Sequence, residues 1–377
     1  MQPLDRGVEE IIVKEHLETA LKSGRKLRVK FGIDPTSPNL HLGHAVVLRK
    51  LRQFQNLGHK IVLIIGDFTA QIGDPSGRSE TRKPLSKKEV KDNMKNYLSQ
   101  ASKVIDVKKA EIHYNGEWHK KEGLKALLGL SQSVSVQQIL ERADFQKRLD
   151  EKKEITMLET MYPLLQGYDS VKIKADLEIG GTDQKFNLLM GRRVQRHFNM
   201  VEQDIITVPL LEGTDGIRKM SKSYGNYISL TEEPNQMFGK IMSVPDNLIE
   251  KYFLLLTDIE PPENLGPYES KMLLAETIIK NFHNENTAKK AEDEFIKVFS
   301  KKELPENLPA LKLTNYNLGL ADLLIAAGIE SKSEARRLIT QNAVEINGAV
   351  KTNPEENLFL HKGDILKIGK KRFYKIS

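Results

Sequence analysis

The stretch KLRVKFGIDPTSPNLHLGHAVVLRKLRQFQNLGHKIVLIIGDF, residues 26–68, carries the clearest folding signal in the chain. It opens with a strand-like run that ends at Gly32 and Asp34, and a loop rich in Pro, Ser and Asn follows. A helix that Gly58 would end comes next, with one stripe formed by His44, Val47, Leu51 and Phe54. The near-continuous apolar run KIVLIIGDF is typical of a buried strand in a parallel sheet. The stretch therefore predicts a βαβ unit.

The motif HLGH, at positions 41–44, falls at the turn between the first strand and the helix. Ligands of open α/β sheets bind at the carboxyl ends of strands, where a helix N-terminus offers free N–H groups to phosphate. A zinc site would need HExxH or cysteine ligands, and a nucleophilic role would need a G-x-S-x-G turn, none of which is present. The location favours anion binding. Two histidines that merely begin a helix are the alternative for this motif alone.

The rest of the sequence divides into segments of different pattern. Strand-like and helix-like segments alternate through the first two-thirds, which predicts a parallel sheet covered by helices. Within it, residues 86–154 read as a helical insertion with a capping box from Ser86 to Glu89 and one amphipathic helix, SVQQILERADFQKRLDEKK. In the C-terminal unit, the sequence pattern predicts two helices and two hairpins, one of them with an Asn-Gly turn. The predicted fold class is α/β, with domains over 1–228, 229–300 (mostly helical) and 318–377 (small, α+β), and a linker over 301–317.

The composition of the 377-residue chain narrows the class of protein. No apolar run is long enough for a membrane span, and the N-terminus lacks the hydrophobic core of an export signal. The absence of cysteine removes disulfides and thiolate chemistry and fits a cytoplasmic location. The net charge is +7, and residues 361–377 hold six Lys or Arg against one Asp. This basic end indicates a polyanionic partner, with a solvated lysine-rich surface as the alternative.

A second motif, KMSKS at positions 219–223, lies in a loop punctuated by Gly213, Gly216 and Gly225. Taken alone it would read as a solvated lysine loop. Neither the P-loop pattern G-x-x-x-x-G-K-[ST] nor the dinucleotide pattern G-x-G-x-x-G occurs, so a nucleotide would have to be held in another way. Imidazoles at a helix N-terminus and two mobile lysines can together hold its phosphates. The pair of motifs therefore favours nucleotide chemistry.

With both motifs in place, the sequence resembles the class I aminoacyl-tRNA synthetases, whose HIGH and KMSKS elements match HLGH and KMSKS in order and separation. Within that class it is similar to the bacterial tyrosyl enzymes along nearly its full length, through FGIDPT, IGDPSGRSETR, YPLLQGYDS and GGTDQKFN. Its C-terminal unit is similar to the RNA-binding module called an alpha-L motif. The resemblance implies a Rossmann-like catalytic domain over 1–228, anticodon recognition by 229–300 and RNA binding by 318–377.

The resemblance implies that ATP is a substrate that carries Mg²⁺, with no organic cofactor and no metal held by the protein. An amino-acid carboxylate is already a nucleophile toward the α-phosphate, so positioning and charge neutralisation suffice. The residues implied in catalysis are His41, His44, Thr36, Lys219, Lys222 and a second basic pair, Arg78 and Arg82, whose alternative is a solvated basic loop. The residues implied in ATP binding are Asp34, His41, His44, Gly181, Asp183, Lys219, Met220, Ser221 and Lys222.

Helical spacing places Tyr162, Gln166 and Asp169 on one face, although Pro163 would start or kink that helix. This face could also be a polar outer surface, with Tyr162 simply in the core. The resemblance implies that Asp169 receives the phenol hydroxyl of L-tyrosine and that its neighbours hold the ammonium group. The full set implied in tyrosine binding is Thr69, Asp74, Tyr162, Gln166, Asp169 and Gln184.

One departure from the family pattern is Lys30, which stands where many tyrosyl enzymes carry a tyrosine that also reads the phenol hydroxyl. We expect Lys30 to be too exposed or too misaligned to replace that tyrosine, which leaves Asp169 as the main acceptor. The alternatives are a tryptophanyl-tRNA synthetase, a nucleotidyltransferase with the same type of phosphate site, and an RNA-binding protein led by its C-terminal module.

The partners implied by the resemblance are L-tyrosine, tRNA(Tyr) and a second copy of the chain, with no membrane involved. Contacts of the homodimer are expected from about residues 115 to 155. The residues expected to meet RNA phosphates are Arg336, Arg337, Lys370, Lys371 and Arg372.

Overall fold

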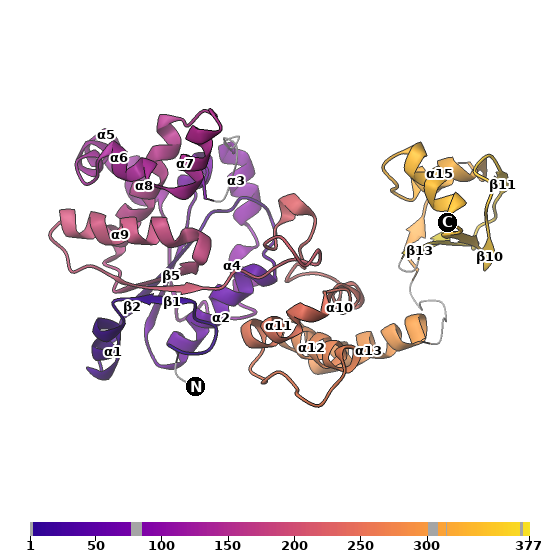
Figure 1. Cartoon of the computed structure of the whole chain (residues 1–377), viewed down its shortest axis with the longest axis horizontal. Helices are drawn as coiled ribbons and strands as arrows, with labels where there is room; N and C mark the ends of the chain where they lie inside the picture. Colours follow the sequence, from indigo (N-terminus) through magenta and orange to yellow (C-terminus); the bar gives the residue numbers. More distant parts are fainter. Residues whose placement is uncertain (1–2, 77–84, 301–307, 314, 370–371) are drawn as a thin grey trace. The chain divides into compact units, whose positions relative to one another are not determined.

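The computed structural model describes residues 3–76, 85–300, 308–313, 315–369 and 372–377. The chain divides into two compact units, Met1–Glu292 (unit 1) and Asp293–Ser377 (unit 2). Figure 1 labels their helices and strands.

Unit 1 is built on a sheet that, within the described residues, has the strand order β1-β6-β5-β2-β3-β4. Its strands are β1 (Glu10–Ile12), β2 (Arg28–Ile33), β3 (Lys60–Ile65), β4 (Glu111–Tyr114), β5 (Leu177–Gly181) and β6 (Asp204–Val208). All neighbours are parallel except β1, which pairs antiparallel with β6. The chain proceeds outward from β2 on one side and from β5 on the other, so the switch point of the topology lies between these two strands. Ligands of open α/β sheets bind at this point.

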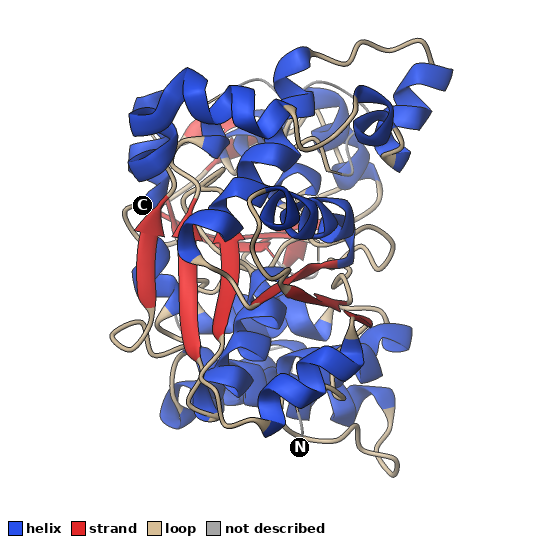
Figure 2. Ribbon diagram, turned by 90° about the vertical axis from the view of Figure 1, so that its left-hand side faces the viewer, coloured by secondary structure: helices blue, strands red, loops and turns tan. Residues whose placement is uncertain are grey.

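Helices lie on both faces of this sheet (Figure 2). The connections β2-α2-β3 and β5-α9-β6 run in opposite directions across the sheet. Because crossovers between parallel strands are right-handed, α2 and α9 therefore lie on opposite faces. The helices up to β6 are α1 (Lys14–Lys22), α2 (Leu42–Asn56), α3 (Lys87–Met94), α4 (Tyr97–Ala101), α5 (Gly116–Ser131), α6 (Val136–Leu140), α7 (Ala143–Asp150), α8 (Met157–Ile173) and α9 (Lys185–His197). The predicted βαβ unit is confirmed as β2-α2-β3, and Val47, Leu51 and Phe54 are buried on α2 as expected.

The insertion begins as predicted but differs from the prediction further along. The side chain of Ser86 accepts the backbone N–H of Glu89, which confirms the capping box that starts α3. The stretch expected to form one amphipathic helix is instead broken into α6 and α7, because Arg142 adopts an extended conformation between them. The buried guanidinium of Arg142 binds Asp144 at 2.6 Å and Asn187 at 2.8 Å, contacts that a continuous helix would not allow. A tertiary anchor thus overrides the helical pattern.

Helix α8 runs without a break through Pro163. A proline in a helix interior removes one N–H from the hydrogen-bond ladder, and α8 nevertheless continues through it with buried residues on both sides. Thr156 caps the helix, with its side chain accepting the N–H of Glu159. The continuous helix carries Tyr162, Gln166 and Asp169 on one face, as the spacing predicted.

The rest of unit 1 is helical, with α10 (Pro234–Met242), α11 (Ile249–Leu256), α12 (Pro267–Phe282) and α13 (Glu285–Phe295), which crosses into unit 2. Helices α10 and α12 each begin at a proline, Pro234 and Pro267. Among the described residues, no helix combines the length and apolar character needed to cross a bilayer.

Unit 2 has its own apolar core, formed around α14 (Leu320–Ala326) and α15 (Lys332–Thr340). Its strands are β7 (Ala310–Leu311), β8 (Asn317–Gly319), β9 (Val344–Ile346), β10 (Ala349–Val350), β11 (Asn357–Phe359), β12 (Ile365–Ile368) and β13 (Arg372–Ile376). Both predicted hairpins are present, β9-β10 and β12-β13, and the first turns at Asn347 and Gly348, both with positive φ. Strand β7 pairs with β13 from within the stretch expected to be a linker.

Candidate active site

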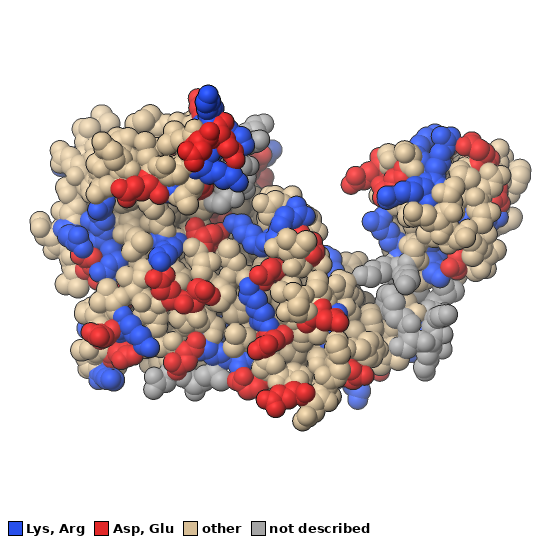
Figure 3. Space-filling model, in the orientation of Figure 1, with Lys and Arg blue, Asp and Glu red and all other residues tan. Residues whose placement is uncertain are grey.

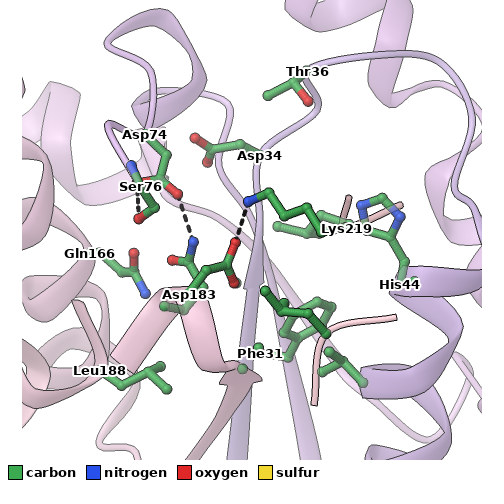
Figure 4. Close-up of a pocket in the computed structure, with 18 of the residues that line it drawn as sticks. Phe31, Asp34, Thr36, His44, Asp74, Ser76, Gln166, Asp183, Leu188 and Lys219 are labelled. Carbon is green, nitrogen blue, oxygen red and sulfur yellow. Dashed lines mark hydrogen bonds and ion pairs between the residues drawn. The ribbon is translucent and has the colours of Figure 1, made fainter. Parts of the chain in front are cut away.

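A pocket of about 930 Å³ opens at the switch point between β2 and β5. It is lined from segments far apart in the sequence, among them the start of α2, one face of α8 and the KMSKS loop (Figure 4). The residues expected from the sequence that line it are Asp34, Thr36, His41, His44, Thr69, Asp74, Tyr162, Gln166, Asp169, Gly181, Asp183, Gln184, Lys219, Met220 and Ser221. The fold therefore gathers nearly the whole expected set around one cavity.

The remaining expected residues are either described away from the lining or not described. Lys222 is not part of the pocket lining, and its ammonium lies 5.5 Å from the centre of the Tyr227 ring. Burial lowers the pKa of Lys222. Arg78 and Arg82 fall outside the described residues, as do Lys370 and Lys371 in unit 2.

The histidines of HLGH sit at the N-terminus of α2, with their ring centres 4.0 Å apart. Burial, followed by the charge of Lys222, lowers the pKa of His44 to about 4, and burial and His44 hold the pKa of His41 well below its usual value. Both rings are therefore neutral at pH 7. The N–H of His41 donates to Nδ1 of His44 at 3.2 Å, which places the ring proton of His44 on Nε2.

The glycine of HLGH lies at a point of close packing. A Cβ on Gly43 would lie 3.0 Å from the ring of His41 and 3.8 Å from the Cβ of Met220. The small residue lets the KMSKS loop and the His41 ring approach the first turn of α2. This turn presents its N–H groups and the positive end of the helix dipole to the pocket.

Across the pocket, the KMSKS loop is tied to the strand end of β5. The ammonium of Lys219 bonds the carboxylate of Asp183 at 2.6 Å (Figure 4). Asp183 follows Gly181, where β5 ends. A lysine expected to reach the phosphates thus lies against the carboxylate expected to bind the ribose.

Two carboxylates organise the middle of the pocket. Asp34 accepts the hydroxyl of Thr69 at 2.8 Å and that of Tyr162 at 3.0 Å. Asp74 accepts the amide of Gln184 at 2.8 Å and the hydroxyl of Ser76 at 2.6 Å. Burial beside Asp34 raises the pKa of Tyr162 well above its usual value, so this phenol stays protonated and its oxygen keeps acceptor capacity. Together these groups form a patch of acceptors suited to a small cation.

Asp169 lies deep in unit 1, 3% exposed, and three donors surround its carboxylate. Trp118 donates at 2.8 Å and His119 at 2.9 Å to one oxygen, and Asn115 donates at 3.2 Å to the other. An ionised carboxylate has about four acceptor positions, so three donors leave room for about one more. Because Asp169 lines the pocket, that position is available to a buried hydroxyl of a ligand.

The expectation for Lys30 was wrong in one respect. Its side chain is 0% exposed, where we had allowed that it was too exposed to matter. The ammonium bonds Glu178 on the neighbouring strand at 2.8 Å and does not line the pocket. Lys30 is therefore committed to a buried ion pair, which a strand pattern alone cannot reveal.

Sequence reasoning missed several polar groups that surround the expected ones: Ser76, Asn115, Trp118, His119, Arg142, Glu178 and Asn187. Most lie in the helical insertion, whose charged surface pattern hides the few residues that turn inward. The one available signal was the cluster NGEWH directly after β4, at the carboxyl edge of the sheet.

Comparison with known proteins decides the family. The model of the class I tRNA synthetases (W and Y) matches residues 22–300, and that of the tyrosine–tRNA ligase SYY-like C-terminal domain matches residues 301–376. A tyrosine–tRNA ligase of Aquifex aeolicus is 50% identical over 380 residues, covering 99% of this chain and 97% of that protein. One from Thermotoga maritima is 49% identical over 390 residues, covering 99% and 96%.

The chain belongs to the tyrosyl-tRNA synthetase family. The synthetase is thus an aminoacyl-tRNA ligase, as the two motifs indicated. The first family model covers tryptophanyl and tyrosyl enzymes alike, and the C-terminal model and the curated relatives favour the tyrosyl branch.

Solved structures agree on the fold of the synthetase. A truncated mitochondrial tyrosyl-tRNA synthetase of Aspergillus nidulans aligns with a TM-score of 0.67 at 20% identity, covering 79% of this chain and 93% of that one. The tyrosyl-tRNA synthetase of Archaeoglobus fulgidus, complexed with L-tyrosine, gives 0.63 at 20% identity, covering 77% and 98%. At such identities the likeness supports the α/β fold alone.

Proposed function

We propose that the pocket binds L-tyrosine and ATP together, joins them as tyrosyl-adenylate, and then passes tyrosine to tRNA(Tyr). A carboxylate oxygen of tyrosine forms a bond to the α-phosphorus, and the bond to the bridging oxygen breaks with its electron pair leaving on pyrophosphate. A ribose hydroxyl at the 3′ end of tRNA then attacks the tyrosyl carbonyl, and AMP leaves. The observation that carries the proposal is the convergence of HLGH, KMSKS and the Asp169 end of α8 on one pocket.

At the tyrosine end, the phenol hydroxyl donates to the remaining acceptor position of Asp169. The ammonium group lies among Asp74, Tyr162 and Gln166, with Thr69 fixing Asp34 beside them. Gln184 reaches the substrate carboxylate from the Asp74 side. Each role follows from the type of group present: acceptors face the cation, and an amide donor faces the anion.

At the ATP end, neutral His41 and His44 donate to phosphate or ribose oxygens without adding charge to the ground state. Thr36, Met220 and Ser221 complete that wall, and Gly181 leaves space for the ribose beside Asp183. Lys219 leaves Asp183 when the ribose arrives and, with Lys222, neutralises the departing pyrophosphate. Electrostatic groups that meet developing charge are the main source of rate in such a step.

Mg²⁺ enters with the nucleotide in this scheme. Phosphate oxygens commonly supply part of the coordination of Mg²⁺ in nucleotide sites. The ion would neutralise phosphate charge, while the side chains of the synthetase orient the reactants. Arg78 and Arg82, outside the described residues, are proposed as a second basic pair at the phosphates.

Unit 2 is proposed to hold tRNA through its phosphates. Arg336 and Arg337 are exposed on α15, and Figure 3 shows basic side chains gathered on one face of this unit. Arg372, with Lys370 and Lys371 outside the described residues, would extend the contact along the β12-β13 hairpin. The helical region 229–300 is proposed to read the anticodon. A protein that uses tRNA and ATP and has no cysteine fits the cytoplasm.

The synthetase is proposed to act as a homodimer. Large apolar side chains are exposed on the insertion, namely Leu124 and Leu128 on α5 and Val136 on α6, and at the start of α8, namely Met157 and Leu158. Exposed apolar groups gathered on neighbouring elements mark interaction surfaces. A second copy of the chain, presenting the same face, is the occupant that fits the expected contacts at residues 115–155.

The test is amino-acid-dependent exchange of pyrophosphate into ATP. The wild type should prefer tyrosine, and Lys219→Ala or Lys222→Ala should each lower the rate by about 10²-fold or more, while tyrosine binding without ATP stays unchanged. Lys240→Ala is the matched control, because Lys240 also lies over the Tyr227 ring, at 5.3 Å, but lies outside the KMSKS loop and pairs with Glu232. Wild-type exchange in both loop variants would disprove the phosphate role of the loop, and a preference for tryptophan would disprove the substrate.

A further inference from the structure

A buried ion pair lies beside the pocket, between the two strands that flank the switch point. Lys30 on β2 and Glu178 on β5 are register partners, 0% and 1% exposed, with 2.8 Å between Nζ and Oε1. Glu178 lines the pocket, whereas Lys30 does not. Buried ion pairs seldom stabilise a fold more than apolar residues of the same size would, so this pair calls for another explanation.

The donor and the acceptor of each hydrogen bond around the pair follow from the chemistry of the groups. Lys30 uses its three N–H groups on Glu178, on the hydroxyl of Ser170 at 2.7 Å and on the backbone carbonyl of Gln166 at 2.9 Å. Ser170 accepts from Lys30, so its own proton goes to the other oxygen of Glu178, at 3.2 Å. The amide of Gln203 donates to that same oxygen. No group in the network can reverse its role.

The last partner of Glu178 is the side chain of Gln166, whose Nε2 donates to Oε1 at 3.4 Å. An ionised carboxylate can only accept, so it must face the amide nitrogen and not the amide oxygen. The oxygen of Gln166 is therefore directed away from Glu178, and Gln166 lines the pocket. Its backbone carbonyl is held by Lys30 in addition, which fixes the residue at both ends.

We propose that the Lys30–Glu178 pair is a positioning device that presents the amide oxygen of Gln166 to the α-ammonium group of the amino-acid substrate. The inference rests on the proposed role of Gln166 in binding that group. A flipped amide would present N–H donors to a cation, losing one charge-assisted hydrogen bond and adding repulsion. Because a buried carboxylate on β5 prevents the flip, the ammonium site is formed before the substrate arrives.

The packing above the pair shows that helix α9 approaches closely at this point. A Cβ on Gly191 would lie 2.5 Å from the amide nitrogen of Gln203, 3.2 Å from Glu178 and 3.3 Å from the hydroxyl of Ser170. Only glycine leaves room for Gln203 to reach Glu178. The ion pair, Gln203 and Gly191 therefore form one arrangement that holds the carboxylate in place.

The central test exchanges the two side chains. Glu178→Gln introduces an amide that can donate to the oxygen of Gln166, so the KM for tyrosine should rise by about 10-fold or more while the KM for ATP stays unchanged. Adding Gln166→Glu restores an acceptor that cannot flip, keeps the charge balance with Lys30, and should recover most of the tyrosine KM. Gln166→Glu alone places two carboxylates together and should also bind tyrosine poorly. A merely structural role would not give this reciprocal rescue.

Two further double variants separate a positioning role of the ion pair from a loss of folding. If Glu178→Gln folds poorly, Lys30→Met/Glu178→Gln removes the unpaired charge and should still raise the KM for tyrosine alone. The control is Arg148→Met/Glu159→Gln, which removes another buried pair, at 2.7 Å, that does not line the pocket. It should leave both KM values unchanged, and an equal rise of the tyrosine KM there would overturn the positioning role.

Gln166→Ala separates this inference from the proposed function. An unchanged tyrosine KM in that variant would refute the role of Gln166 itself. A raised tyrosine KM in Gln166→Ala, with wild-type values in Glu178→Gln and in Lys30→Met/Glu178→Gln, would leave that role standing and refute the positioning by the ion pair.

Discussion

At the scale of single residues, the pocket separates neutral donors from charged ones. The low pKa values of His41 and His44 keep the rings neutral near pH 7, because burial and the nearby Lys222 oppose a further positive charge. In the proposed mechanism, positive charge is carried instead by the lysines of the KMSKS loop, which approach as pyrophosphate departs.

The first prediction concerns stability at low pH. The pKa of His44 is about 4 in the folded chain against a usual value of 6.5, so between these values the unfolded chain binds a proton that the folded chain does not. Stability should therefore fall as pH drops from 6.5 toward 4, by up to about 1.4 kcal/mol per pH unit from this residue. Urea unfolding of the wild type and of His44→Asn, at pH 7 and pH 5, should show a smaller loss in the variant. Parallel losses would contradict the assignment.

The second prediction concerns the choice between tyrosine and phenylalanine. Asp169→Asn replaces an acceptor by a group that can donate, so tyrosine activation should fall by about 100-fold while phenylalanine activation changes much less. Relative kcat/KM for pyrophosphate exchange measures the ratio. Asp176→Asn serves as the control, since Asp176 pairs with Arg25 outside the pocket. An undiminished preference for tyrosine in Asp169→Asn would mean that another group reads the hydroxyl.

At the scale of elements, the helical insertion serves two surfaces. On its inner side, Arg142 donates a hydrogen bond to Asn187. On the same side, Asp169 accepts hydrogen bonds from Asn115, Trp118 and His119. Its outer side exposes apolar residues of α5 on one helical face. One insertion thus supports the part of the pocket proposed to bind tyrosine and offers the surface proposed for the second copy.

The third prediction concerns that outer surface. Leu128 is 59% exposed on α5, and Leu128→Glu would place a charge in a contact between two copies. The variant should sediment as a monomer at concentrations where the wild type sediments as a dimer. Leu57→Glu is a matched control, since Leu57 is 57% exposed at the end of α2, outside the stretch 115–155 where the dimer contacts are expected. A monomeric wild type, or a dimeric Leu128→Glu protein, would refute this interface.

At the scale of the whole molecule, the chain forms two units, each compact by itself. Unit 2 has a separate apolar core, and its β7 strand joins the sheet through β13. The residues that line the pocket proposed to form the adenylate all belong to unit 1. The first half-reaction should therefore need unit 1 alone, and the second should need both.

The fourth prediction tests this division. Removing residues 301–377 should leave tyrosine-dependent pyrophosphate exchange close to the wild-type rate while lowering tRNA aminoacylation steeply. Binding of tRNA to the full chain should weaken strongly with rising salt, because basic side chains release counterions from phosphates. Arg336→Ala/Arg337→Ala in the full chain should act in the same direction as the deletion. Equal loss of both half-reactions would indicate that unit 2 supports the fold of unit 1.

The sequence by itself determined the parts whose signal is local. The βαβ unit, the capping box at Ser86, the Asn347-Gly348 turn and the two motifs each depend on residues a few positions apart. Most of the pocket lining followed as well, because strand ends in a parallel sheet converge at one edge. Helical spacing also placed Tyr162, Gln166 and Asp169 on a single face despite Pro163.

Only the tertiary structure decided where distant polar groups meet. The predicted helix is interrupted at Arg142, because the guanidinium of Arg142 binds Asn187, 45 residues away in the sequence, and pairs with Asp74. From the sequence, Lys30 was expected to be too exposed or too misaligned to replace the usual tyrosine. In the folded chain, β5 places Glu178 beside it, and the two form a buried ion pair. The energy of a buried charge depends on what surrounds it, and its surroundings come from segments that only the folded chain brings together.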